Sequence, residues 1–243
     1  MKKATIVLDI PAPEPPFEGF SQETFKFLHG LKKNNTKAWF EAHRSDYEQY
    51  LREPSIRLVS TMGQEFAHAK LPLISDRKRS LFRINRDIRF SKDKSPYKTH
   101  IGIVFPVAGL KEDEWSGMYL GFEPSGKGDI KAHIGGGCYM PSSAYLKRIR
   151  KLVNTNHKEL EKLNSQKNFK RDYPRGVVDS GDSLKRMPKG YEEDHPAAKW
   201  LKMKSFTFDS ALTKKDLLSP SLPDIIVKKI KAARQVLEFF AKA

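Results

Sequence analysis

Hydrophobic positions near the N-terminus recur every three or four residues, which is the period of an amphipathic helix. Three helices follow from this pattern. Ser21 is a suitable cap for the first helix, and Asn35 or Thr36 for the second. Pro54 is expected to end the second helix and to begin the third. The three apolar stripes are Phe25, Leu28 and Leu31; Trp39, Phe40, His43, Tyr47, Tyr50 and Leu51; and Leu58, Met62 and Phe66.

After Pro72 the hydrophobic period changes from 3.6 to two, which indicates strands. The predicted strands cover residues 81–90, 99–107, 115–123 and 129–135. Their connections are short, and short connections join neighbouring antiparallel strands because a parallel crossover needs roughly a dozen residues or more. The pattern therefore predicts an antiparallel meander of four or more strands.

Helical periodicity returns after the sheet. One helix is expected to begin at Ser142 or Ser143, and a second helix to run through Leu160 and Leu163. A third is expected over residues 196–204, and the last begins at Pro223 and Asp224. Residues 174–196 are rich in turn formers, and residues 205–209 form a short segment without a helical pattern. With the helices before the sheet, these elements predict a single α+β domain over residues 17–243. A flexible, proline-rich arm over residues 1–16 precedes it.

The charge of the chain is strongly unbalanced, with 45 Lys and Arg against 29 Asp and Glu and a formal net charge of +16. Such an excess favours anionic partners: nucleotides, phosphorylated small molecules, nucleic acid or an acidic lipid surface. The lysines are spread along the whole chain, so an alternative is that most of them lie on solvated helix faces.

Cys138 is the single cysteine, which excludes an intramolecular disulfide and a zinc site built from several cysteines. A reducing, cytoplasmic location is therefore favoured. No apolar segment approaches the roughly 18 residues that span a bilayer, so no membrane partner is expected. The histidines are scattered and no metal site is predicted, although His100 and His133 are the nearest candidates because both lie on predicted strands. The sequence identifies no cofactor.

Two glycine-containing stretches resemble phosphate-binding loops. Residues 121–128 approach the P-loop pattern, but Gly128 follows Lys127 where Ser or Thr would hold magnesium, and a strand is predicted next. We interpret this stretch as a hairpin turn. A later run of three glycines leaves a predicted strand and leads towards a helix, so the backbone N–H groups of Gly136 and Gly137 are candidate anion donors. A turn that requires positive φ is the alternative.

The densest functional signal is a charged hairpin predicted over residues 83–100. Strand alternation divides its first strand into a polar face with Arg83, Asn85, Asp87 and Arg89 and an apolar face with Phe82, Ile84, Ile88 and Phe90. Arg86 falls on the apolar face. Because an unpaired buried guanidinium is costly, Arg86 is expected to pair with a carboxylate, to reach an edge or to face a ligand.

The hairpin offers groups for two chemical roles. Guanidinium and ammonium groups suit the recognition of phosphate or carboxylate, and side chains that titrate can transfer protons. The anion-binding candidates are Arg83, Arg86, Arg89, Lys92, Lys94 and Lys98, together with Gly136 and Gly137, and the proton-transfer candidates are Asp87, Tyr97 and His100. The alternative is a solvated sheet face with a charged hairpin that Arg–Asp pairs stabilise.

These residues favour an anion-recognising domain whose ligand is a phosphate-bearing small molecule or a nucleotide, and they leave open whether it is an enzyme. One alternative is a non-catalytic nucleic-acid-binding module in which Phe90, Tyr97 and Trp115 stack on bases. Another is a scaffold whose charged loop docks an acidic protein partner. The sequence assigns neither a reaction nor an oligomeric state.

Four motifs resemble those of the domain-of-unknown-function family 2461, over about residues 17–210. The motifs are Asn34-Asn35-x-x-x-Trp39-Phe40; Arg83-x-x-Arg86-Asp87-x-Arg89-Phe90-Ser91-Lys92-Asp93-Lys94-x-Pro96-Tyr97-Lys98-Thr99-His100; Gly136-Gly137-x-Tyr139-x-Pro141; and Leu184-Lys185-Arg186-x-Pro188-x-Gly190-Tyr191 with His195-Pro196 beyond. The long central motif is highly specific. The resemblance implies a single α+β domain of about this size and no established activity, so the function has to be argued from the residues.

Overall fold

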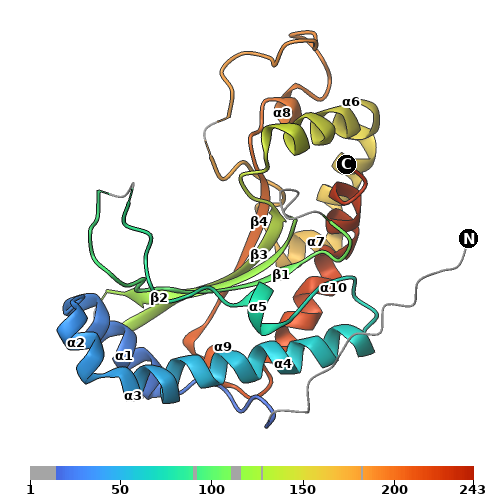
Figure 1. Ribbon diagram of the computed structural model, residues 1–243. Helices are drawn as coiled ribbons and strands as arrows, with labels where there is room; N and C mark the ends of the chain where they lie inside the picture. The colour runs from blue at the N-terminus through green and yellow to red at the C-terminus, as the bar shows by residue number, and fades with distance from the viewer. Residues whose placement is uncertain (1–14, 90–91, 111–115, 127, 182) are drawn as a thin grey trace, which may run out of the picture.

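The computed structural model describes residues 15–89, 92–110, 116–126, 128–181 and 183–243. Its centre is an antiparallel four-stranded sheet in the order β1-β2-β3-β4, with helices before and after it in sequence (Figure 1). The strands are β1 (Ile101–Pro106), β2 (Gly117–Ser125), β3 (Asp129–Cys138) and β4 (Phe206–Leu212). The predicted α+β class is confirmed.

The helices fall into an N-terminal and a C-terminal group. The first group comprises α1 (Gln22–Lys33), α2 (Lys37–Ala42), α3 (Arg44–Tyr47), the π-helical turn η1 (Glu48–Arg52), α4 (Glu53–His68) and α5 (Arg77–Ser80). The second comprises α6 (Ser143–Ser165), α7 (Lys167–Asp172), α8 (Ala198–Leu201), α9 (Lys214–Leu218) and α10 (Leu222–Phe240). No helix in the described part of the chain combines the length and apolar character that crossing a membrane requires.

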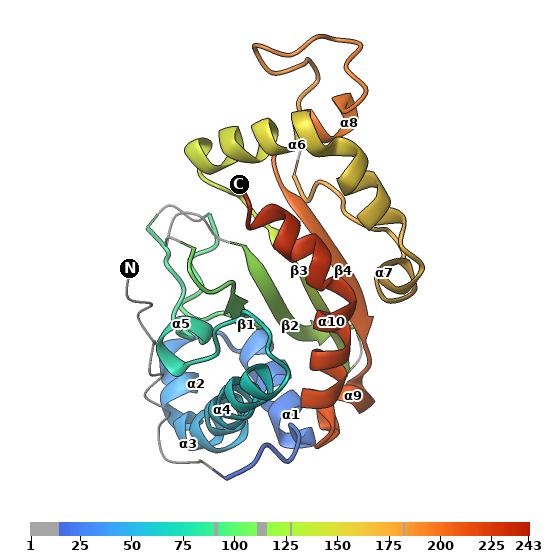
Figure 2. The ribbon, with the colours of Figure 1, turned by 90° about the vertical axis from the view of Figure 1, so that its right-hand side faces the viewer.

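The two faces of the sheet differ in what covers them. Ile103, Leu120 and Ile134 are in register on one face and are fully buried. Helices α1, α4 and α10 lie on that side (Figures 1 and 2). We call the other side the open face, because no helix of the described chain lies over it in Figure 1. By register the open face carries Gly102, Tyr119, Gly121, Glu123, His133 and Asp209.

Pro54 does not end a helix, which corrects the sequence prediction. Helical conformation continues through α3, η1 and α4. Proline has no N–H to donate to the carbonyl four residues earlier, which belongs to Tyr50. That oxygen instead accepts a hydrogen bond from the Thr24 hydroxyl at 2.5 Å, and the chain widens into the π-helical turn. Helix α1 thereby supplies the hydrogen bond that lets the helix pass through the proline.

The segment 81–90 is not a strand of the sheet, which is a second correction. Leu81 forms a single bridge to Ile103 of β1, and the chain then leaves the sheet and pairs with its own returning segment at Asn85 and Tyr97. The resulting hairpin rises from the sheet on the side away from α1 and α4 (Figure 1). Too little of this segment pairs with β1 to extend the sheet.

The predicted alternation of the hairpin fails for the same reason. Ile84 is buried, but Phe82 is 57% exposed and Ile88 is 38% exposed. A period of two is imposed only where one face of a strand is packed, and this segment has no sheet layer beneath it. The ammonium of Lys98 lies 5.2 Å from the centre of the Phe82 ring, so a cation–π contact covers part of that ring instead. Phe90 lies outside the described residues.

The remaining strand predictions correspond to β1, β2 and β3, whereas β4 was missed and expected only as the short segment 205–209. It pairs antiparallel with β3 from Phe206 to Leu212. The stretch 121–128 contains the turn between β2 and β3, with positive φ at Gly126 and Gly128. The hairpin-turn interpretation is confirmed.

A single cluster of buried side chains extends from Phe17 to Phe240 and includes residues of both helix groups. If residues 17–243 form one domain, as the sequence predicts, both helix groups should unfold together. We expect variants that retain only Trp39 of α2 or only Trp200 of α8 to show coincident denaturant transitions by fluorescence and by circular dichroism. Separate midpoints for the two tryptophans would contradict a single domain.

Candidate functional site

The base of the hairpin is attached to α2 through the side chain of Asn35. Its amide donates a hydrogen bond to the backbone oxygen of Tyr97 at 2.9 Å, and its carbonyl oxygen accepts one from the backbone N–H of Tyr97 at 3.1 Å. The Tyr97 ring stacks on Phe40 of α2, with centroids 4.1 Å apart and an angle of 17°. Two of the sequence motifs, far apart along the chain, therefore meet at this point.

A groove of about 690 Å³ lies between the hairpin base, the edge strand β1 and helices α2 to α4. We call it the hairpin groove. Its charged lining residues are Lys37, Glu41, Arg44, Glu48, Arg52, Arg77, Arg83, Lys98 and His100. The two carboxylates in this set are paired, Glu41 with Arg44 at 2.7 Å and Glu48 with Arg52 at 2.9 Å. The lining is therefore strongly cationic.

The cations at the hairpin base lie close enough to perturb one another. Partial burial lowers the pKa of Lys98, and the positive charges of Arg83 and Arg86 lower it further. Desolvation also lowers the pKa of His100; Glu123 opposes this shift, whereas Lys98 and Arg86 add to it. Like charges held together in this way gain stability when an anion binds between them.

Other predicted residues of the hairpin neutralise one another near its tip. Arg89 donates to both carboxylate oxygens of Asp87, at 3.0 and 2.7 Å, and these bonds lower the pKa of Asp87. The ammonium of Lys94 donates to the backbone oxygen of Ile88 at 2.9 Å. Lys92 is exposed. Asp87, Arg89, Lys92 and Lys94 are not among the residues that line the hairpin groove.

Arg86 has a carboxylate partner, which was one of the three alternatives that the sequence left open, because its guanidinium pairs with Asp93. Hydrogen bonds from the backbone and side chain of Ser95, and then Arg86, lower the pKa of Asp93 to about 2. This carboxylate is therefore ionised at neutral pH. Arg86 holds the loop together and adds positive charge near Lys98 and His100.

Gly136 and Gly137 lie inside β3 and not in a turn that leads into a helix. Their register partners on β2 are Met118 and Gly117, whereas Gly102 of the hairpin groove is opposite Gly121, farther along β2. A Cβ on Gly136 would lie 2.5 Å from the sulfur of Met118, so close packing explains this glycine. Gly137 has the positive φ of the turn alternative, +107°, although it lies in β3 and not in a turn. The structure does not bring these glycines to the hairpin.

Sequence reasoning missed the contribution of the helices to the groove. Lys37, Glu41, Arg44, Glu48 and Arg52 recur at intervals of four, three, four and four residues. Helix α2 ends at Ala42 and His43 has non-helical backbone angles, so these residues come from α2, α3 and η1 and not from one face of a continuous helix. The spacing was visible in the sequence, but only the position of the hairpin base beside these helices distinguishes the residues from an ordinary solvated surface.

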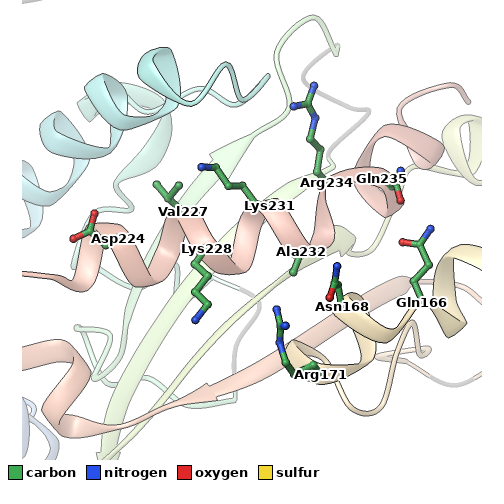
Figure 3. A pocket seen from close by; sticks show the side chains of 10 residues that line it. All are labelled: Gln166, Asn168, Arg171, Asp224, Val227, Lys228, Lys231, Ala232, Arg234 and Gln235. Atoms are coloured by element: carbon green, nitrogen blue, oxygen red, sulfur yellow. The ribbon is translucent and has the colours of Figure 1, made fainter.

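A second hollow, of about 730 Å³, lies between α7 and α10 and offers weaker chemistry (Figure 3). Lys228 and Arg171 point towards each other there, but Lys231 and Arg234 project from the other side of α10. Arg171 pairs with Asp172 at 3.0 Å and Arg234 with Glu238 at 2.7 Å. These cations lie on solvated helix faces and do not converge.

No cluster of three or more His, Cys, Asp or Glu side chains suited to a metal ion occurs among the described residues. Cys138 is buried, and burial raises the pKa of its thiol to about 11. The chemistry of the hairpin groove is therefore that of cations and an imidazole.

The fold and the groove define an α+β protein with a cationic groove beside the edge strand of an antiparallel sheet. The chain belongs to the family of conserved hypothetical proteins designated DUF2461, whose model matches residues 23–239. This match confirms the resemblance seen in the sequence. The comparisons with curated proteins and with solved structures give no match.

Replacing Asn35 with Ala should release the hairpin from α2. Both backbone hydrogen-bonding groups of Tyr97 would lose their partner, and we expect a loss of about 1–3 kcal/mol in the free energy of unfolding. Asn34→Ala is the matched control, because Asn34 donates only one exposed hydrogen bond, to Gly30. Denaturant titration of both variants measures the difference, and equal losses would contradict the assigned role of Asn35.

Proposed function

We propose that the protein binds a phosphate-bearing small molecule or a nucleotide in the hairpin groove. Arg83, Lys98 and His100 are assigned to the anion, with Arg86 adding positive charge from its pair with Asp93. The observation that carries the proposal is that Arg83, Lys98 and His100 line one groove at the hairpin base. Partial burial is the main cause that lowers the pKa of Lys98, and the charges of Arg83 and Arg86 add to it. Positive charges that are held together and partly desolvated cost stability, and a negatively charged ligand would offset that cost.

If the site is catalytic, His100 is the group suited to proton transfer. It is exposed, lines the groove and has a lowered pKa, so it is mostly neutral at pH 7 and able to accept a proton. Asp87 is tied to Arg89 in an ion pair. Tyr97 is 5% exposed and stacks on Phe40, so we reassign it to anchoring the hairpin.

A concave arrangement of cations favours a small ligand over nucleic acid, which would be served better by a stripe along one face. Of the stacking residues expected for a nucleic-acid module, Tyr97 is already engaged, because its ring stacks on Phe40. Phe90 and Trp115 lie outside the described residues. Cytoplasmic location belongs to the same proposal, and the single, buried, unpaired cysteine supports it.

The assignment of the anion contacts is tested with Lys98→Ala and Arg83→Ala in isothermal titration with inorganic phosphate and ribose 5-phosphate. Loss of a charge-assisted hydrogen bond should weaken binding about tenfold or more. Lys92→Ala is the matched control, because Lys92 is an exposed lysine of the same hairpin that does not line the groove. Absence of binding to the wild type, or equal losses in Lys92→Ala and Lys98→Ala, would overturn the proposal.

Binding of an anion should also depend on pH through His100. The pKa of His100 is lowered in the free protein and should rise when an anion binds, so binding takes up a proton and the affinity should increase as the pH falls. Sulfate is the suitable probe because its charge is constant between about pH 8 and about pH 5.5, whereas a phosphate monoester titrates near pH 6.

We expect a several-fold gain in sulfate affinity over this range for the wild type and for His68→Gln, whose histidine lies at the end of α4. The gain should be absent in His100→Gln. A pH dependence that persists in His100→Gln would contradict the role assigned to this imidazole.

A further inference from the structure

The open face of the sheet carries an aromatic ring laid over two glycines. A Cβ on Gly102 of β1 would lie 2.8 Å from the hydroxyl oxygen of Tyr119, and a Cβ on Gly121 of β2 would lie 2.5 Å from Cε1 of the same ring. Both glycines have ordinary backbone angles, so the turn requirement of positive φ does not explain them. They leave room for the Tyr119 ring to lie against the sheet.

The ring is partly accessible to solvent. Tyr119 is half-buried, and no helix of the described chain lies over the open face (Figure 1). A tyrosine in a sheet ordinarily stands away from the backbone, whereas the far end of this ring, with Cε1, Cε2 and the hydroxyl, lies over the two glycines. A flat aromatic surface of this kind suits stacking with a planar ligand.

Polar groups surround the ring. His133 lies beside it, with ring centroids 5.5 Å apart and an angle of 35°. Desolvation lowers the pKa of His133; Asp209 and Glu123 oppose this shift and Lys131 adds to it, so the imidazole offers one donor and one acceptor. Burial, together with Glu123 and Tyr139, raises the pKa of Tyr119, which keeps its hydroxyl protonated.

This aromatic surface adjoins the hairpin groove. Gly102, over which the hydroxyl end of Tyr119 lies, is itself a lining residue of the groove. His100 precedes it by two residues, a separation of about 7 Å along an extended chain. A ligand whose anionic group lies near His100 and Lys98 therefore has the Tyr119 ring within reach of its remaining part.

We propose that the ligand of the hairpin groove is a nucleotide, whose base stacks on Tyr119 and whose base edge bonds to His133. This inference rests on the proposed function, because it assigns the phosphate of the nucleotide to Arg83, Lys98 and His100. A sugar phosphate would use only the cations. The Tyr119 ring over the two glycines adds a stacking surface that a ligand with a planar ring would use and a sugar phosphate would not.

The test compares adenosine and guanosine monophosphates with ribose 5-phosphate by isothermal titration of the wild-type protein. Base stacking should make at least one nucleotide bind about tenfold more tightly than ribose 5-phosphate. Tyr119→Ala should remove this advantage and leave the affinity for ribose 5-phosphate unchanged. Tyr119→Phe, which keeps the ring, should retain it.

Gly102→Ala provides a second variant in which Tyr119 is still present. Its new methyl group would displace the end of a flexible side chain and no backbone atom, so the fold should be kept and the stacking advantage lost. Lys98→Ala should weaken the binding of nucleotides and of ribose 5-phosphate to the same extent, because it removes a contact to the phosphate and none to the base.

The outcomes separate this inference from the proposed function. Equal affinity for the nucleotides and ribose 5-phosphate would overturn the nucleotide assignment and leave the anion site intact. Failure of all these ligands to bind would overturn both. A single-stranded oligonucleotide that binds more than tenfold tighter than either mononucleotide would also overturn the assignment, in favour of a nucleic-acid surface.

Discussion

The two hydrogen bonds between the Asn35 side chain and the backbone of Tyr97 fix the geometry on which the hairpin groove depends. Asn35 directly precedes α2, whose following turns supply one wall of the groove. Tyr97 directly precedes Lys98 and His100, which supply the other. Because one amide holds both segments, the two walls are positioned relative to each other without a further strand. The Tyr97 ring also stacks on Phe40, so an apolar contact holds the same two segments together.

The hairpin divides its charges between two tasks. Near the tip, Asp87 pairs with Arg89 and Asp93 with Arg86, so carboxylates and guanidiniums satisfy one another and hold a loop that has little sheet pairing of its own. At the base, partial burial lowers the pKa of Lys98, and the charges of Arg83 and Arg86 lower it further. The dense charge of this segment therefore combines structural ion pairs with a smaller group of cations, to which we assign the proposed anionic ligand.

The sequence predicted what depends on local pattern. The helical stripes, strands β1 to β3 and the turn at Gly126 follow from periodicity and turn chemistry. Strand β4 was missed because its partner β3 lies far earlier in the chain. The sequence of a short apolar segment does not indicate pairing with so distant a strand. The hairpin was expected in the sheet because its alternation is clean, but alternation does not show whether a neighbouring strand accepts the pairing. Within the candidate site the charged residues of the hairpin were visible in the sequence. Their division into ion pairs and groove-lining cations, and the contribution of the helices, depend on tertiary contacts.

The π-helical turn at Glu48–Arg52 bears on the direction in which Arg44 faces the groove. Each residue of an α-helix turns the chain by about 100°. A π-helical turn closes with one residue more than an α-helical turn, so it takes up an extra residue with little rotation of the helix faces on either side of it. Arg44, which lines the groove, therefore keeps its direction relative to the part of α4 that packs in the core. Deleting one residue there would return the segment to ordinary α-helix and leave the direction in which Arg44 faces largely unchanged. The π-helical turn is thus a place where the length of the chain can change without turning this wall of the groove.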